Sequence, residues 1–401
     1  KLVEATWDQA FGAIEAKLKG LDGTKIAAIA GDQCDAEAMV ALKDLVTALG
    51  SPNIDCRQDG AKLDGGPRGS YIFNPGVRGI DSADAVLLIG TNPRWESPVL
   101  NARLRKRYLA GHCAIASVGP AVDLTYPVER LGAGPATLRD LIDGKLGFFE
   151  KLKAAKHPLI VVGMGALARE DGAAVLAMAR DLAEKLDAVR LDWNGFAILH
   201  TTAARVGGLD LGLVPAEGGR DVAGILVGCE KREIEVVYLL AADEIDAERL
   251  GKAFVIYQGH HGDAGAHRAD VILPGAAYTE KPGTYVNTEG RVQFGQRAAY
   301  PPGDARDDWA VLRALSERLG KTLPYDTLDE VRARLVAVNK NFAALDQQAA
   351  GSWGMFGKAG TVSDAPFVSP IANFYMTCPI SRASKTMAEC MASRAQLMAA
   401  E

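Results

Sequence analysis

The sequence predicts an α/β fold of two doubly wound, mainly parallel αβα sheets, followed by an extended C-terminal arm. Short apolar strands alternate with amphipathic helices along most of the chain, which is typical of parallel sheets covered on both faces. The unit that starts at Lys25 is similar to the unit that starts at Pro158, which indicates two sheets of one kind. A stretch rich in glycine and proline after Leu345 predicts the arm.

The Lys25 unit begins with a strand over residues 25–30, and Gly31 turns the chain. Asp35 then caps a helix that ends at Gly50. A second apolar run, residues 85–89, ends in a short polar turn before another helix. The apolar residues of the first helix recur every three or four positions and predict one buried face: Met39, Leu42, Val46 and Leu49.

The Pro158 unit repeats this scheme with a strand over residues 158–162 and a turn at Gly163. Asp171 precedes its helix, which is followed by two more apolar strands over residues 235–240 and 254–257. The buried face of the helix is predicted to hold Val175, Met178, Leu182 and Leu186.

The remaining chain has a different character. Glycines interrupt the segment from Ala269 to Ala299, and we expect a structured loop there rather than a regular layer. Asp307 caps a helix that carries Trp309, Leu312, Leu315 and Leu319 and that Gly320 closes, and Ser381 caps a last helix. That last helix presents a docking face of Met387, Met391 and Met398.

These elements predict four regions along the 401 residues. Residues 1–150 form a first αβα region, and residues 151–300 form a second with the glycine-rich loop. Residues 301–345 form a helical return, and residues 346–401 form the extended arm and terminal helix.

Composition excludes several classes of protein. The formal net charge is −5, which offers no basic field for a nucleic-acid backbone, so nucleic acid is not an expected partner. No apolar stretch approaches the ~18 to 20 residues needed to cross a bilayer, so no direct membrane span is expected. The six cysteines form no C-x-x-C pair and supply no local metal or cluster motif: Cys34, Cys56, Cys113, Cys229, Cys378 and Cys390.

The first candidate site is the turn Gly90-Thr91-Asn92-Pro93-Arg94, which follows a buried strand and precedes a basic helix. Ligands collect at that edge of a parallel sheet, and helix N-termini favour anions, so a nucleotide or pterin phosphate is one interpretation. The other is that Asn92 and Pro93 only shape the turn; we favour it because both the G-x-G-x-x-G fingerprint and the P-loop are absent. The basic residues of the helix are Arg103, Arg105, Lys106 and Arg107.

The second candidate is Gln258-Gly259-His260-His261-Gly262-Asp263, also directly after a strand. Paired histidines beside a carboxylate could bind zinc or carry out acid-base chemistry. Consecutive residues rarely point the same way, however, and His267 is six residues on. A hydrogen-bonded structural loop is therefore the favoured interpretation.

The third candidate is the glycine-rich stretch Ala269 to Gln293, whose glycines permit close backbone approach. Its polar residues could hold either a loop or a polar ligand: Thr279, Glu280, Asn287, Glu289 and Arg291. Trp95 and Trp309 are expected to be packing residues. We assign no catalytic residue, cofactor-binding residue or metal ligand to this chain.

Three strings closely resemble the largest iron-sulphur subunit of respiratory complex I, the NADH:quinone oxidoreductase. They are ADAVLLIGTNPRWESPVLNARLRK, YQGHHGDAGAHRADVILPGAAYTEKPGTYVNTEGRVQ and FYMTCPISRASKTMAEC. The ADVILP and GTYVNTEGRVQ strings are also similar to the wider molybdopterin oxidoreductase superfamily, whose αβα domains enclose a pterin. The resemblance covers essentially the whole chain and implies two αβα sheets of the molybdopterin-oxidoreductase type.

The resemblance also implies a function. The family's subunit carries 2Fe-2S and 4Fe-4S clusters on grouped cysteines, which this chain lacks, so its ligands are expected upstream of Lys1. The family's version of this αβα part is understood to hold no molybdenum. The chain is then a scaffold within a subunit that passes electrons from NADH and flavin towards quinone, and the isolated chain is expected to be inactive.

Partners and location follow from the same resemblance. We expect other peripheral-arm subunits of complex I, including the flavin subunit, and a place beside an energy-transducing membrane on its cytoplasmic side in bacteria or matrix side in mitochondria. One alternative is a molybdopterin-dependent oxidoreductase, such as a formate dehydrogenase relative. Another is a non-redox structural or assembly protein.

Overall fold

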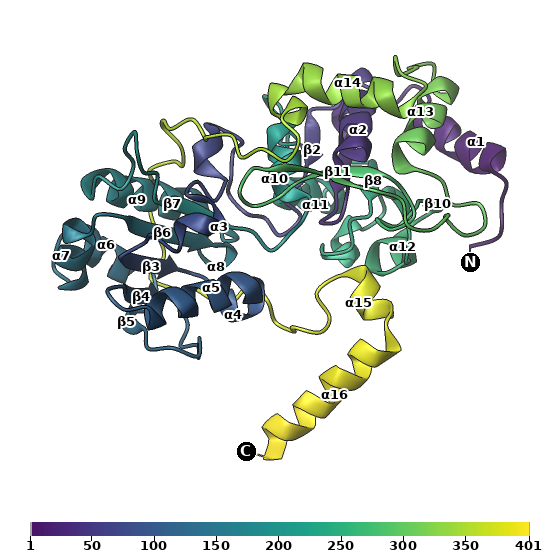
Figure 1. The fold of residues 1–401 in the computed structure, drawn as a ribbon. Helices are drawn as coiled ribbons and strands as arrows, with labels where there is room; N and C mark the ends of the chain where they lie inside the picture. Colours follow the sequence, from purple (N-terminus) through teal and green to yellow (C-terminus); the bar gives the residue numbers. More distant parts are fainter. Residues whose placement is uncertain (1, 401) are drawn as a thin grey trace.

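Two parallel five-stranded sheets form the body of the protein in a computed structural model, which describes residues 2–400 and the side chains of residues 2–394 (Figure 1). The first sheet has the strand order β10-β9-β8-β1-β2 and the second has the order β5-β4-β3-β6-β7. All pairings within these two sheets are parallel, which confirms the predicted fold class.

The first sheet consists of β1 (Ile26–Ala30), β2 (Asn53–Asp55), β8 (Val236–Leu240), β9 (Phe254–Gly259) and β10 (Val271–Pro274). One face is covered by α2 (Ala36–Ala48), against which α13 (Asp308–Arg318) and α14 (Leu328–Val338) pack. The other face packs against α11 (Val222–Glu230) and α12 (Ala264–Arg268), and α1 (Trp7–Leu18) contacts β10. Asp35 caps α2 as predicted, because its carboxylate accepts from the backbone N–H of Ala38.

The second sheet consists of β3 (Ala85–Ile89), β4 (Ala114–Val118), β5 (Glu129–Gly132), β6 (Pro158–Gly163) and β7 (Phe196–Leu199). Residues of α5 (Pro98–Leu109) cover one face, and α6 (Pro135–Ile142), α7 (Phe148–Ala154) and α9 (Gly172–Lys185) cover the other. Short helices lie at the strand ends: α3 (Gly76–Gly79), α4 (Pro93–Glu96), α8 (Met164–Leu167) and α10 (Arg205–Asp210). None of the helices in the described part of the chain is long and apolar enough to cross a membrane.

The predicted boundary at residue 150 is wrong for the sheets. The chain makes β1 and β2 of the first sheet, builds the whole second sheet over residues 85–199, and returns for β8, β9 and β10. Residues 1–150 therefore contain strands of both sheets. In the middle of the first sheet β1 pairs with β8, a strand that begins more than 200 residues later in the chain. Local periodicity does not reveal a pairing between such distant segments.

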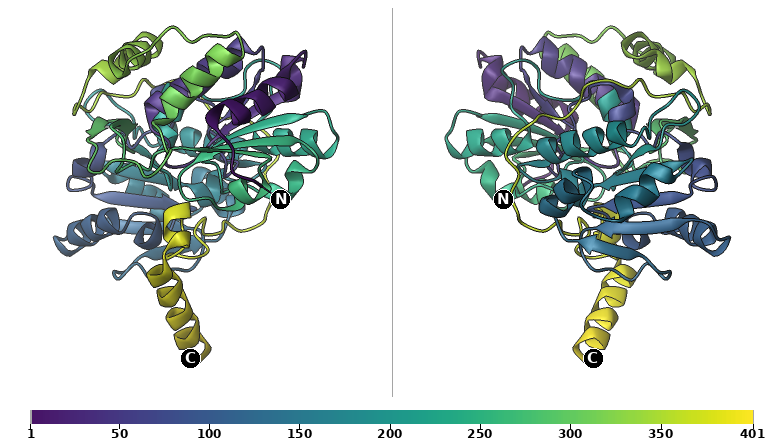
Figure 2. Two further views of the ribbon diagram at one scale, coloured as in Figure 1. Left: turned by 90° about the vertical axis from the view of Figure 1, so that its right-hand side faces the viewer. Right: turned by 90° about the vertical axis from the view of Figure 1, so that its left-hand side faces the viewer.

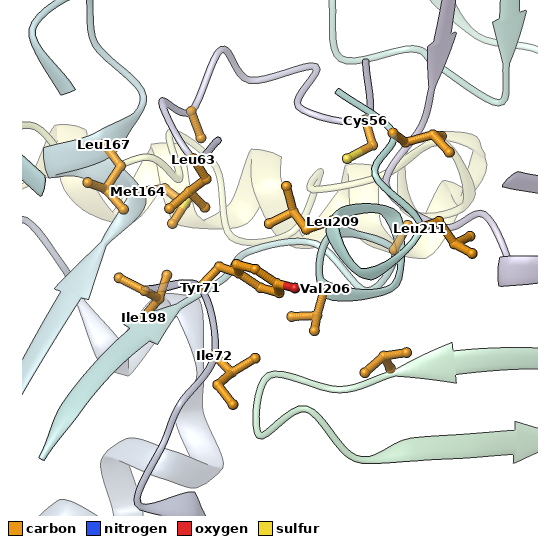
Figure 3. Close-up of a cluster of buried hydrophobic side chains, with 14 of the residues drawn as sticks. Cys56, Leu63, Tyr71, Ile72, Met164, Leu167, Ile198, Val206, Leu209 and Leu211 are labelled. Carbon is orange, nitrogen blue, oxygen red and sulfur yellow. The ribbon is translucent and has the colours of Figure 1, made fainter. Parts of the chain in front are cut away.

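A shared apolar cluster joins the two halves (Figure 3). Tyr71, Ile198 and Met164 come from segments of the second sheet's half, and they pack with Val206 and Leu209 of α10 and with Leu63. Burial of one continuous cluster makes the two sheets one folding unit rather than two separable domains.

The segment predicted as a loop between Ala269 and Ala299 contains regular structure. Strand β10 extends the edge of the first sheet, and β11 (Gly283–Val286) pairs antiparallel with β12 (Val292–Gly295) in a separate hairpin. Its glycines do not prevent pairing, because Gly283 and Gly295 lie opposite each other at the open end of the hairpin.

The arm after Leu345 is extended, as predicted, and straps the two halves together. It leaves α14, crosses the second sheet's half and returns to α15 (Pro379–Ala383) beside the first sheet (Figures 1 and 2). Backbone hydrogen bonds hold it along this path: Gly69 N–H donates to Ser352, Lys358 N–H to Ala173 and Phe367 N–H to Ala133. The rings of Trp353, Phe356 and Phe196 contact one another at the crossing.

The last helix, α16 (Lys385–Ala400), projects from the body (Figure 2). The prediction that Ser381 caps it is wrong: Ser381 lies inside α15, whose cap is Cys378, and the Ser384 hydroxyl accepts from Met387 N–H at the start of α16. Met387 is half-buried and Met391 is exposed, whereas the side chain of Met398 lies outside the described residues.

Candidate functional site

The carboxyl ends of both sheets face a common cleft. In the first sheet the strand order reverses between β1 and β8, and in the second it reverses between β3 and β6. Such switch points are where open α/β sheets bind ligands, because the loops on either side diverge. Gly31 lets the loops approach at the first of them: a Cβ on this residue would lie 1.8 Å from the carbonyl oxygen of Ala241.

A cavity of about 470 Å³ occupies this cleft. Asp32 follows β1, Asp59 follows β2 and Glu244 follows β8, so the first sheet contributes three carboxylates to the lining. The second sheet's half contributes Ala168 and Thr201. The arm supplies the remaining wall with Pro370, Ile371, Ala372, Asn373, Met376 and Thr377.

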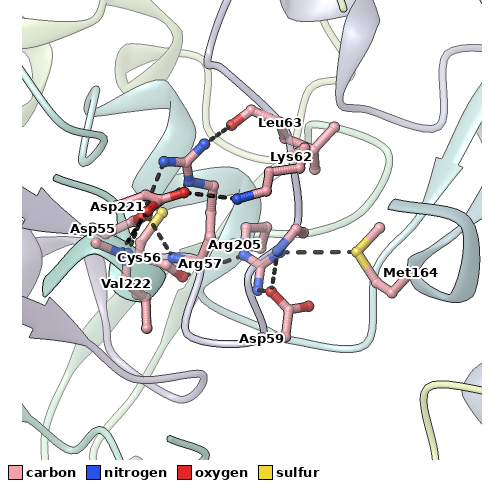
Figure 4. A network of polar contacts seen from close by, with 12 residues as sticks. Asp55, Cys56, Arg57, Asp59, Lys62, Leu63, Met164, Arg205, Asp221 and Val222 are labelled. Carbon is pink, nitrogen blue, oxygen red and sulfur yellow. Dashed lines mark hydrogen bonds and ion pairs between the residues drawn. The ribbon is translucent and has the colours of Figure 1, made fainter. Parts of the chain in front are cut away.

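A fully buried arginine organises the acidic side of the cleft (Figure 4). The Arg205 guanidinium donates to Asp59 over 2.8 Å and to the backbone carbonyl of Cys56 over 3.3 Å. Burial raises the pKa of Asp32 to about 7, although Arg205 acts to lower it. Burial and Arg205 lower the pKa of His200 to about 4, so this imidazole is neutral at pH 7.

We expect Asp32→Asn to stabilise the protein more at pH 8 than at pH 5. A carboxyl group with a folded pKa of about 7 and an unfolded pKa of about 3.9 binds more protons when folded between these pH values. The free energy of unfolding of the wild type therefore falls as the pH rises through this window, whereas that of the variant does not. The gain at pH 8 should exceed the gain at pH 5 by about 2–3 kcal/mol, measured by urea unfolding at both pH values. An equal gain at both pH values would contradict this assignment.

Arg382 of α15 fastens the arm over the cleft. Its guanidinium donates to Asp263 over 2.5 Å, to Glu244 over 2.5 and 3.1 Å, and to the carbonyl of Met376. The carboxylates raise the pKa of Arg382 against the opposing effect of burial. This latch ties the end of the arm to the first sheet.

Arg382→Ala should release the end of the arm. Loss of a half-buried guanidinium with two carboxylate partners is expected to lower the free energy of unfolding by about 1–3 kcal/mol. Limited proteolysis should then cut residues 368–378 at a raised rate, with Lys385→Ala, a neighbouring change that leaves the latch intact, as control. Equal cleavage of both variants would show that Arg382 does not hold the arm.

The polar groups of the turn Gly90 to Arg94 bind the carboxylate of Glu96, two residues after the turn. The hydroxyl of Thr91 donates to Glu96 over 2.8 Å, and the backbone N–H of Asn92 donates to the same carboxylate. Burial raises the pKa of Glu96 to about 7. The carboxylate occupies the place of an external anion, and Arg94 of the turn pairs with Asp123. On the basic helix, Arg103 pairs with Asp81 and Arg107 donates to the carbonyl of Ala83. These contacts support the turn-shaping interpretation.

The His260 and His261 rings meet each other, with their Nδ1 atoms 2.7 Å apart, but Asp263 is engaged by Arg382. His267 lies on α12 and is exposed. Within the described residues no group of three or more His, Cys, Asp and Glu side chains is arranged to hold a metal ion. The contacts of this loop include the hydrogen bond between the two imidazoles and the ion pair of Asp263 with Arg382.

The polar residues of the stretch 269–293 hold the hairpin in place. The Asn287 side chain accepts from the N–H groups of Glu289 and Arg291, and the Glu289 carboxylate accepts from Val77 N–H over 2.6 Å. Glu280 accepts from the N–H of Ala277, while Thr279 is exposed and its backbone carbonyl accepts from Ala298. These groups are engaged with protein, which leaves them little capacity for a ligand.

Lys281 anchors the start of this hairpin in a buried ion cluster. Its ammonium lies 2.5 Å from Asp35 and is hydrogen-bonded to Asp308, and all three side chains are more than nine-tenths buried. Although burial alone would lower it, the two carboxylates raise the pKa of Lys281, so it stays charged. Asp308 also accepts from the Gln258 amide, which links the hairpin, α13 and β9.

Sequence reasoning missed the residues that line the cleft. Asp32 could have been found, since it follows the predicted strand over residues 25–30, the rule that selected Gly90 and Gln258. Asp59 follows β2, a strand that the sequence does not predict. Arg205 could not, because it lies in a glycine- and alanine-rich segment and gains its role only when β2 and α10 meet. Of the tryptophans, Trp309 packs against the core and Trp95 lies under the guanidinium of Arg394 at 4.6 Å.

Comparison with known proteins gives two family matches. Residues 1–318 match the molybdopterin oxidoreductase family model, and residues 338–390 match the model for the C-terminal part of the NADH-ubiquinone oxidoreductase G subunit. Solved structures share the fold. Acetylene hydratase from Pelobacter acetylenicus has a TM-score of 0.59 at 13% identity, with 89% of this chain and 64% of that chain covered. The formyltransferase/hydrolase complex from Methylorubrum extorquens has a TM-score of 0.57 at 18% identity, with 79% and 97% covered.

Curated relatives are similar over nearly the whole chain. The mitochondrial NADH dehydrogenase (ubiquinone) iron-sulfur protein 1 of Solanum tuberosum is 42% identical over 391 residues, covering 96% of this chain and 52% of that protein. The NADH-quinone oxidoreductase G subunit of Rickettsia bellii is 40% identical over 397 residues, covering 99% and 57%. The chain thus spans about half the length of these relatives, and the resemblance drawn from the sequence strings is confirmed.

The cleft does not fit the pterin that the fold suggests. A molybdopterin carries phosphate, whereas the described residues that line the cavity include three carboxyl groups and no lysine or arginine to bind it. Asp59 and Glu244 are already paired with Arg205 and Arg382, and the arm lines the same cavity. The described residues that line the cavity include no cysteine, and the buried Cys34 thiol donates to the backbone carbonyl of Leu240. The residues at this switch point are therefore arranged for packing against the arm.

Proposed function

The chain belongs to the molybdopterin oxidoreductase family, and from that premise we propose that it is the scaffold part of the iron-sulphur subunit of an NADH:quinone oxidoreductase. One observation carries this proposal. The arm residues that line the cleft, within 370–377, lie inside residues 338–390, the segment that matches the model for the C-terminal part of the NADH-ubiquinone oxidoreductase G subunit. The segment that lines the cleft thus belongs to the part of the chain that matches this family model, which supports the proposal.

In this function the chain positions other groups and transfers no electrons itself. The full subunit would carry 2Fe-2S and 4Fe-4S clusters in a part before Lys1, and electrons would pass along them from NADH and flavin towards quinone. The buried ion clusters, the shared apolar core and the strap of the arm make the two sheets a rigid support for such a module. A rigid support matters because electron transfer depends on fixed distances between clusters.

The partners proposed are the other peripheral-arm subunits of complex I, among them the flavin subunit. The location proposed is peripheral to the respiratory membrane, on the cytoplasmic side in bacteria or the matrix side in mitochondria. A molybdopterin-dependent oxidoreductase and a non-redox assembly protein are not favoured, because the curated relatives similar over nearly the full chain are named as complex I subunits.

The test is co-purification from the source organism. An affinity tag on the full-length subunit should bring down flavin, iron-sulphur signals in electron paramagnetic resonance, and NADH:quinone reductase activity. Arg382→Ala should reduce the yield of assembled complex, whereas Lys385→Ala should not. Recovery of the tagged subunit without flavin or NADH dehydrogenase activity would contradict the proposal.

A further inference from the structure

An apolar groove lies where α1 meets α13, near the β10 edge of the first sheet. It has a volume of about 490 Å³ and is walled by Trp7 and Phe11 of α1 and by Val311 and Ala314 of α13. The segment between β12 and α13 supplies Tyr300, whose side chain is 79% exposed. Leu2 and Val3, just before α1, are exposed as well.

The groove is lined by aromatic side chains from two segments of the chain. A tyrosine, a tryptophan and a phenylalanine together form an aromatic-lined depression, the kind of site in which one or two apolar anchors of a partner become buried. Trp7 and Phe11 are already fixed against each other, with ring centroids 5.6 Å apart. Little ordering of the groove is needed before a partner binds.

The rim of the groove carries two arginines, Arg297 and Arg306, and one carboxylate, Asp307. Arg297 lies 4.4 Å over the Tyr300 ring and, among the described residues, forms no ion pair, while Arg306 has its nearest carboxylate, Asp304, at 3.9 Å. The Arg297 guanidinium can therefore bind a carboxylate from outside, whereas Arg306 also donates to the backbone carbonyl of Ala305. The groove suits an apolar segment with acidic residues beside it.

We propose that this groove binds the cluster-bearing part of the same full-length subunit, through an apolar segment flanked by acidic residues. This inference rests on the proposed function. The chain spans about half of its curated relatives, and the C-terminal family model lies at residues 338–390. Most of the relatives' unmatched length therefore precedes the region that corresponds to α1, the helix that forms one wall of the groove.

The location accounts for the composition of the groove. The part of the subunit that precedes α1 must pass close to Leu2 and Val3, so a module on this side meets the groove at high effective concentration. An intramolecular contact of this kind fixes the cluster module against the two sheets. This contact assigns the proposed scaffold function to the groove between α1 and α13.

A photoreactive residue tests the contact directly. In the full-length subunit, Tyr300 is replaced by p-benzoyl-phenylalanine, the purified protein is irradiated, and crosslinked peptides are identified by mass spectrometry. The expected adduct joins residue 300 to a peptide from the cluster-bearing part of the same polypeptide. Ala314→Trp, which fills the groove, should lower the yield of that adduct by about fivefold or more.

Ala337→Trp is the matched control, because Ala337 is an exposed helical alanine on α14 outside the groove, and it should leave the yield unchanged. An adduct with another polypeptide, with a second copy of the subunit or only within residues 1–401, or no adduct at all, would overturn the proposal. Mass spectrometry detects a crosslink within one polypeptide whether or not NADH dehydrogenase activity co-purifies with it. Failure of the groove assignment and failure of the proposed function are thus separate results.

Discussion

Lys281→Met is expected to lower the free energy of unfolding by about 3–5 kcal/mol, the largest effect of a single substitution that the structure predicts. The change leaves Asp35 and Asp308 facing each other without a cation, and both carboxylates are buried. Asp35 also caps α2 and Asp308 bonds Gln258, so neither can move into solvent without breaking a second contact. Urea or guanidinium unfolding at pH 7 measures the loss.

Two further variants separate the ion cluster from the lysine stem. Lys145 also contacts two aspartates, Asp140 and Asp143, but on the surface, and Lys145→Met should cost less than about 1 kcal/mol. Combining Lys281→Met with Asp308→Asn removes one uncompensated charge and should restore part of the stability. A single Lys281→Met variant as stable as the Lys145→Met variant would refute the buried-cluster account.

Arg205→Met should be the second-largest loss, about 3 kcal/mol. Methionine keeps most of the volume, but the hydrogen bonds to Asp59 and to the Cys56 carbonyl disappear, and Asp32 and Asp59 then lie in the cleft without a cation. The loss is somewhat smaller than at Lys281 because Asp59 is partly accessible to water. Arg205 also lies where α10 joins the two halves, so near-ultraviolet circular dichroism should change as well.

Arg318 supplies the surface control, since it contacts Asp8 and Glu15 with a side chain that is 42% exposed. Arg318→Met should cost less than about 1 kcal/mol. The deficit of Arg205→Met should also shrink at acid pH, because protonation of Asp32 and Asp59 removes the uncompensated charges. A deficit that does not depend on pH would point to lost packing rather than lost charge compensation.

Local sequence signals were sufficient for the elements with strong periodicity. The strands at residues 85–89 and 158–162 and the helix after Asp35 were predicted closely, since an apolar run or a capped amphipathic helix is a local property. The assignment of strands to sheets was wrong, because it depends on β1 pairing with β8 across the whole second sheet. The hairpin of β11 and β12 was missed because its glycines were interpreted as loop signals.

The candidate site also has a part that local sequence signals predict and a part that depends on contacts between distant segments. The rule that ligands bind at strand ends selected the turn at Gly90 and the loop at Gln258, and both segments do lie at the ends of strands in the structure. Their polar groups, however, bond to other protein groups: Thr91 to Glu96, and Asp263 to Arg382. The cleft itself depends on distant segments, among them the ends of β1, β2 and β8 and arm residues 370–377, and Arg205 of α10 bonds one of its carboxylates. No single window of sequence contains these residues together, so the acidic cleft and its closure required the structure.

The measurement that tests the central claim most directly is metal analysis of the chain after expression in a host that makes molybdopterin, with molybdate and iron supplied. The acidic cleft closed by the arm leads us to expect neither stoichiometric molybdenum nor iron, and no NADH dehydrogenase activity from the isolated chain. Stoichiometric bound molybdenum, lost together with a pterin on denaturation, would show that the cleft is a working cofactor site and would contradict the scaffold account.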